Sequence, residues 1–167
     1  MSVLDRLTPF VTWLAHTRVS QGIGDIAWIT PLVQSVHILA IAVVMSGVLM
    51  LDLRLLSVVG REQTTAQFAG RYLPWVWWSL LVLLATGATL IVGEPRRSLE
   101  NPVFVLKMSL LLIASALTLT VQLPLRRDDR FWETPGRRAA ACAIALVSLA
   151  VWACIVFAGR WIAYAQG

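Results

Sequence analysis

The sequence contains few charged residues. Asp, Glu, Lys and Arg make up 14% of its 167 residues, whereas a typical soluble domain contains about 25%. Apolar residues account for 58%, so the charged side chains are too few to cover a compact globule. The composition excludes an ordinary soluble domain and indicates a protein whose surface faces lipid.

Cysteine and histidine are also scarce, with two of each. Cys142 and Cys154 lie in one apolar run, and on a helix they would be roughly 18 Å apart, too far to bond to each other. The sequence has no Cys-x-x-Cys pattern and no Cys-x-x-Cys-His pattern for haem attachment. It also lacks a Ser-His-Asp set, a carboxylate pair within an apolar run and a phosphate-binding loop, so hydrolysis and phosphoryl transfer are not expected.

Four apolar runs are long enough to cross a bilayer, which takes about 20 helical residues. Because backbone groups in lipid must be satisfied within the segment, these runs are predicted to be helices. Proline marks their expected starts, at Thr30-Pro31, Pro74, Asn101-Pro102 and Thr134-Pro135. We therefore predict an all-α fold, an integral membrane four-helix bundle with spans at about 29–51, 74–93, 103–123 and 139–159.

Residues 1–28 follow a different pattern. Leu4, Leu7, Val11 and Leu14 recur at helical spacing, with polar residues off that stripe. This pattern is typical of an amphipathic helix lying in the membrane surface. We therefore divide the chain into an amphipathic interfacial segment and hinge (1–28) and a four-transmembrane-helix domain (29–167).

Arginine and lysine are distributed unevenly between the two sides of the predicted membrane. The side with the loops after spans one and three carries eight arginines, and the other side carries five or six basic residues. The positive-inside rule then places both termini in the periplasm of a bacterial inner membrane. The expected partner is the lipid bilayer, with a homo-oligomer or a membrane-complex partner also possible, and nucleic acid is not expected.

His37 is an ionisable residue inside the first span, where such groups are costly and need a reason. Helical spacing places Thr30, Gln34, His37, Ile41 and Val44 on one face, which we expect to point into the bundle. In one interpretation, a neutral imidazole bonds a neighbouring helix and only fixes packing. In the other, one ring nitrogen is an axial ligand of haem iron or copper, and an acceptor orients the other nitrogen. Gln34 is then a neighbouring candidate for cofactor binding.

Lys107 lies near the start of the third span, where the helix dipole disfavours a cation. Either its ammonium extends to the membrane interface, or it points inward as a proton donor or as a partner for an anionic ligand, which makes it the candidate catalytic residue. Arg96 and Arg97 precede it and are candidates to bind carboxylates such as haem propionates. His16 is a candidate second ligand if the amphipathic segment folds over the bundle.

Other polar and small residues in the spans predict structural roles. Asp52 and Arg54, at the end of the first span, indicate a boundary ion pair. Ser46-Gly47 and Thr86-Gly87 predict close helix contacts within lipid.

Two stretches of sequence carry a resemblance to a known group. The span that contains His37 ends in GVLMLDLRLL (residues 47–56), and the third span begins NPVFVLKMSLLL (residues 101–112). Over roughly residues 30–121 this resembles small bacterial four-helix membrane proteins of the HemJ and CopD type. The chain looks closest to an uncharacterised branch with a similar His-to-DLRLL first span.

The resemblance implies a function and a cofactor. HemJ-type proteins oxidise protoporphyrinogen and bind haem b, with a histidine in an early span and a lysine in a later one, which His37 and Lys107 would match. We therefore expect an inner-membrane haem-b-binding protein that transfers electrons or, as a haem-dependent oxidoreductase, oxidises a small hydrophobic molecule. CopD-type proteins are linked to copper uptake, which implies copper handling with His37 as metal ligand as an alternative. A structural subunit of a membrane complex is a third possibility.

Overall fold

The computed structural model describes residues 3–95, 99 and 102–161, and these residues contain helices and no β-strand. Two short helices come first, α1 (Val3–Ala15) and α2 (Arg18–Asp25). Four long helices follow, with a short 3-10 helix, η1 (Phe131–Glu133), before the last: α3 (Ile29–Leu55), α4 (Thr65–Gly93), α6 (Pro102–Leu125) and α7 (Pro135–Trp161). The predicted all-α fold is confirmed.

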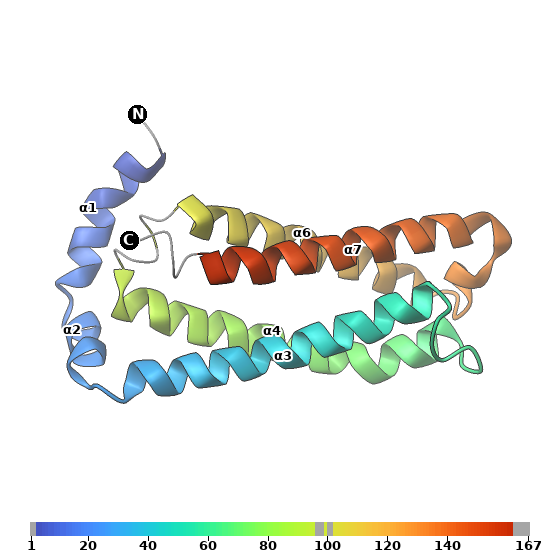
Figure 1. The fold of residues 1–167 in the computed structure, drawn as a ribbon, viewed down its shortest axis with the longest axis horizontal. Helices are drawn as coiled ribbons and strands as arrows, with labels where there is room; N and C mark the ends of the chain where they lie inside the picture. The colour runs from blue at the N-terminus through green and yellow to red at the C-terminus, as the bar shows by residue number, and fades with distance from the viewer. Residues whose placement is uncertain (1–2, 96–98, 100–101, 162–167) are drawn as a thin grey trace.

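The four long helices run alongside one another and alternate in direction, as Figure 1 shows. The main contacts join α3 to α4, α6 to α7, and α3 to α7. Each helix contains a stretch long and apolar enough to cross a membrane: 29–55, 65–93, 103–125 and 135–159. Large apolar side chains such as Leu39, Leu112 and Phe157 are 67 to 75% exposed. Because so much apolar surface is stable only against lipid or a partner, the chain is a membrane protein.

Proline marks the starts of two spans as predicted. The helices α6 and α7 begin at Pro102 and Pro135. In contrast, α3 begins at Ile29 with Trp28 as its N-cap and no side-chain cap bond. The Thr30-Pro31 pair therefore lies inside the first turn and does not mark the start of this helix as predicted.

The second span begins earlier than predicted. Thr64 accepts a hydrogen bond from the Gln67 backbone N–H, and the Gln67 side chain accepts one from the Thr64 N–H. This capping box satisfies free N–H groups at the start of α4. The prediction that Pro74 begins the span is therefore wrong, since Pro74 lies inside α4.

A close backbone approach holds α3 against α4. A Cβ atom added to Gly47 would lie 2.6 Å from Val76 Cγ2, so only glycine fits there without a shift. This confirms the predicted close helix contact at Gly47 and agrees with the preference for small residues between helices in lipid. A side-chain hydrogen bond links α4 to α6: Trp77 Nε1 donates to Gln122 Oε1 at 3.0 Å.

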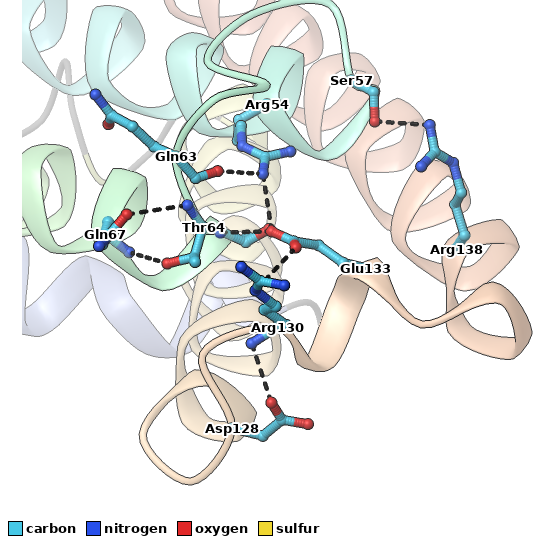
Figure 2. Close-up of polar contacts among 10 residues, drawn as sticks. Arg54, Ser57, Gln63, Thr64, Gln67, Asp128, Arg130, Glu133 and Arg138 are labelled. Atoms are coloured by element: carbon cyan, nitrogen blue, oxygen red, sulfur yellow. Dashed lines mark hydrogen bonds and ion pairs between the residues drawn. The ribbon is translucent and has the colours of Figure 1, made fainter.

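A polar network closes the end of the bundle where η1 lies, which we call the η1 end (Figure 2). Arg54 is buried, and its Nη2 donates to the Gln63 carbonyl at 2.6 Å and to Glu133 Oε1 at 2.8 Å. The same Glu133 oxygen accepts from the backbone N–H and the hydroxyl of Thr65, at 2.8 and 2.9 Å. Arg54 therefore pairs with Glu133, and the predicted boundary ion pair between Asp52 and Arg54 is wrong.

The helices α1 and α2 lie across the opposite end, which we call the α1/α2 end (Figure 1). Val11 is fully buried, whereas Phe10 and Trp13 are half or more exposed, as expected of an amphipathic helix. A Cβ atom added to Gly93 would lie 2.9 Å from Ile23 Cγ2, so α2 packs directly on the end of α4. The N-terminal segment is therefore docked on the bundle.

Candidate functional site

His37 lies on the inward face of α3, toward the α1/α2 end. The buried residues Ala40 and Val44 follow it at helical spacing. Its ring is half-buried and reaches α4, where Nδ1 lies 2.7 Å from Thr86 Oγ1. A Cβ atom added to the next residue, Gly87, would lie 3.7 Å from the His37 ring. The predicted close helix contact at Thr86-Gly87 is therefore where the His37 imidazole packs against α4.

The bond between His37 and Thr86 has a defined direction. Thr86 Oγ1 also lies 2.7 Å from the carbonyl of Val82, to which it donates. A hydroxyl has one hydrogen, so once Thr86 donates it to Val82, its oxygen can only accept from His37. A neutral His37 ring then carries its proton on Nδ1, and the Nε2 lone pair is free.

Lys107 reaches the same level of the bundle from α6. Its Nζ lies 3.7 Å from the position that a Cβ atom on Gly159 of α7 would occupy. Lys107 is half-buried and close enough to His37 to act on it electrostatically. All four long helices thus contribute to one site, which we call the His37–Lys107 site and define as His37, Thr86, Gly87, Lys107 and Gly159.

The two nitrogens that could hold a ligand remain accessible. The fully buried side-chain atoms without a hydrogen-bond partner, among the residues described, belong to Asp52, Arg54 and Trp152. Neither His37 Nε2 nor Lys107 Nζ is one of them, and no described residue bonds to either atom. The site therefore offers the lone pair of His37 Nε2 and the nearby ammonium of Lys107. The lone pair suits a metal ion, and the ammonium suits an anionic group on the same ligand.

The other predicted ligands are exposed or lie outside the described residues. His16 is exposed in the turn between α1 and α2, and Gln34 is exposed on α3. Their roles as ligands stay predictions. Arg96 and Arg97 lie outside the described residues, so their predicted role stays a prediction as well.

A small cavity lies one helical turn from the pair toward the α1/α2 end. Its volume is about 10 Å³, room for about one water molecule. Its lining residues include Val33 of α3, Thr89 of α4 and Ile23 of α2. A porphyrin is far larger, so it would have to reach His37 through the accessible part of the site instead.

A metal site built from several side chains is not found in the described part of the chain. No group of three or more His, Cys, Asp or Glu residues there is placed to hold a metal ion. Within those residues, His37 is therefore the metal-ligand candidate that the His37–Lys107 site offers.

Sequence reasoning recognised Thr86, Gly87 and Lys107 without predicting that they meet. Thr86 and Gly87 were expected only to pack, because a threonine-glycine pair is common in close helix contacts. Gly159 was not singled out at all. The sequence offers one hint that His37 and Lys107 meet: both lie near the N-terminal ends of their spans, and hence at a similar depth in the membrane.

A family model described as "Family of unknown function (DUF6644)" matches residues 11–165. No curated protein and no solved structure matches the chain.

Proposed function

The chain belongs to this DUF6644 family, and because membership brings no assigned activity with it, we propose from the residues themselves that the protein binds haem b in the membrane. His37 Nε2 is the proposed iron ligand, in a bacterial inner membrane with both termini in the periplasm. Bound haem would supply one-electron redox chemistry. The protein would use it to transfer electrons or to oxidise a small hydrophobic molecule.

One observation carries this proposal: the hydrogen bond from His37 to Thr86. Histidines that ligate metals usually donate their second ring N–H to an acceptor, which fixes the tautomer and the ring orientation. Thr86 provides such an acceptor, and the Val82 carbonyl holds the Thr86 hydroxyl in the accepting state. A histidine that served packing alone would not require Nε2 to be accessible and unbonded.

Lys107 adds charge that suits the same ligand. The propionate groups of haem b are anionic, and a nearby ammonium stabilises them by a charge-assisted hydrogen bond. Lys107 lies beside Gly159 at the level of His37, so we propose that it binds a propionate or an anionic substrate. The resemblance to HemJ-type proteins, which use an early histidine and a later lysine, supports the same assignment.

The decisive experiment is an absorption spectrum of the detergent-purified, full-length protein after haem is added. We expect a Soret band in the wild-type protein and its loss in His37→Ala. Added imidazole should restore the band in His37→Ala, because the free base replaces the missing ligand. A colourless wild-type protein, or a His37→Ala variant with an unchanged band, would contradict the proposal.

The alternatives give different results with the same variant. Copper handling predicts a flat reduced-minus-oxidised spectrum and a loss of metal accumulation in His37→Ala. A structural subunit predicts no cofactor and a weaker membrane complex. Neither has a specific contact in its favour, since the described residues hold no multidentate metal group.

A further inference from the structure

A second polar site lies deep in the bundle, well away from His37. Asp52 is only 2% exposed, although it is an acidic residue inside a membrane helix. It lies fifteen residues after His37 along α3, which corresponds to about 22 Å. Two hydrophobic clusters of the core flank it: one contains Val48 and Trp152, and the other contains Leu51 and Ala145.

Two buried hydroxyl groups lie at the level of Asp52. Ser148 of α7 is 3% exposed, and its hydroxyl lies close to the Asp52 carboxyl. Thr118 of α6 is 5% exposed. Lys107 of α6 lies against Gly159 of α7. Thr118 comes eleven residues after Lys107, and Ser148 comes eleven residues before Gly159, so both lie toward the η1 end from that contact. Eleven residues make about three helical turns, so both hydroxyls share the depth and the face of that contact.

Two atoms near this level have no hydrogen-bond partner. Asp52 Oδ2 and Trp152 Nε1 are both buried and unpaired. Trp152 lies one turn from Ser148 on α7 and is 3% exposed. Helical side chains lean toward their own N-terminus, and α3 and α7 run in opposite directions (Figure 1). Asp52 and Trp152 therefore lean toward each other's level.

The charge of Asp52 is not balanced by the nearest arginine. Arg54 uses its Nη2 for Gln63 and Glu133 at the η1 end. A buried carboxylate without a countercharge is strongly destabilising. Ionisable residues in membrane helices accordingly mark ion or substrate pathways more often than simple packing. A buried carboxyl of this kind is neutralised either by a proton or by a positive charge small enough for the core.

We propose that Asp52, Ser148 and Thr118 bind a small monovalent metal cation, with Na⁺ as the best match. Carboxylate and hydroxyl oxygens are hard ligands that suit hard cations. One carboxylate balances one positive charge, which favours a monovalent ion over Ca²⁺ or Mg²⁺. The Trp152 N–H cannot ligate a cation, but it can donate to a water molecule in the shell of the ion. This site is independent of haem binding at His37.

The test is thermal unfolding of the full-length protein in detergent, followed by circular dichroism while NaCl replaces choline chloride at fixed pH and ionic strength. We expect the wild-type Tm to rise and saturate with Na⁺, because a ligand that binds only the folded state stabilises it. We expect the rise to be lost in Asp52→Asn. Binding of radioactive sodium to the same samples should show the same pattern.

Two further variants keep the test decisive if Asp52→Asn does not fold. Ser148→Ala and Thr118→Val keep the carboxylate and should shift the Na⁺ midpoint to higher concentration. Ser109→Ala is the matched control, since Ser109 is exposed and donates to its own helix at Val105. The proposal is overturned if the wild-type Tm does not respond to Na⁺, or if it responds only to pH, which would assign a proton instead.

Discussion

His37 and Thr86 form a 2.7 Å hydrogen bond between α3 and α4 that commits one imidazole nitrogen and leaves the other free. The direction of this bond follows from a second one, in which Thr86 donates to the Val82 carbonyl. Together the two bonds mean that Thr86 of α4 fixes the orientation of the His37 ring. The first prediction tests this dependence.

Thr86→Val removes the acceptor while keeping the shape of the side chain. We expect haem affinity to fall by about 10- to 100-fold, as for other groups that orient a metal-ligating histidine. Thr86→Ser, which keeps the hydroxyl, should bind close to the wild-type level. Haem titration followed at the Soret band measures both variants. Equal affinity in all three proteins would show that Thr86 does not orient the ligand.

Lys107 is predicted to contribute charge. Lys107→Met keeps the length of the side chain and removes the ammonium, so it should weaken haem binding while the spectrum of the bound form stays unchanged. Lys107→Arg should retain most of the affinity, because guanidinium also binds carboxylates. The measurement is the same titration, carried out at low and high salt. A wild-type affinity in Lys107→Met would place the amine outside the binding site.

Gly47 is predicted to limit the distance between α3 and α4. Gly47→Ala places a methyl group 2.6 Å from Val76 Cγ2, and such overpacking typically costs about 1–3 kcal/mol. Gly70→Ala is the control, since no atom lies within 4 Å of its added Cβ, and it should leave stability unchanged or raise it. Thermal unfolding in detergent measures both. Adding Val76→Ala to Gly47→Ala should recover part of the loss, and a failure to do so would point to another cause.

Glu133 is predicted to stabilise the η1 end. Glu133→Ala leaves the buried Arg54 without its carboxylate and removes two bonds to Thr65. Breaking a buried pair from one side costs about 3–5 kcal/mol, and we expect the lower part of this range because the Glu133 side chain is 29% exposed. Arg130→Ala is the matched control: Arg130 is 75% exposed and 4.0 Å from Glu133, so its loss should cost less than about 1 kcal/mol. Equal effects would contradict the assigned network.

The start of α4 shows where local sequence rules conflict. Pro74 was expected to begin the span because proline favours the first turn of a helix. The capping box of Thr64 and Gln67 is a stronger start signal, because it satisfies free N–H groups at the helix end. Proline inside a membrane helix is tolerated because neighbouring groups can satisfy the carbonyl that it leaves unpaired.

A shared site for His37 and Lys107 was predicted, but the residues of α4 and α7 that complete it were not. His37 and Lys107 stood out because each is an ionisable group within an apolar run. Their relation to Thr86 and Gly159 depends on the register and rotation of four helices, which hydropathy does not report. The pairing of Arg54 with Glu133 likewise joins residues that are far apart in the chain.

The sequence by itself determined that this chain forms four apolar helices in a membrane, because the length and hydropathy of each run are local properties and lipid permits few other backbone structures. Only the tertiary structure decided which polar side chains meet. Thr86 faces His37 and Ser148 faces Asp52 because the close packing of α3 against α4 and α7 sets how the helices are aligned and turned. That alignment arises from contacts such as Gly47 against Val76, which bring together residues distant in the sequence.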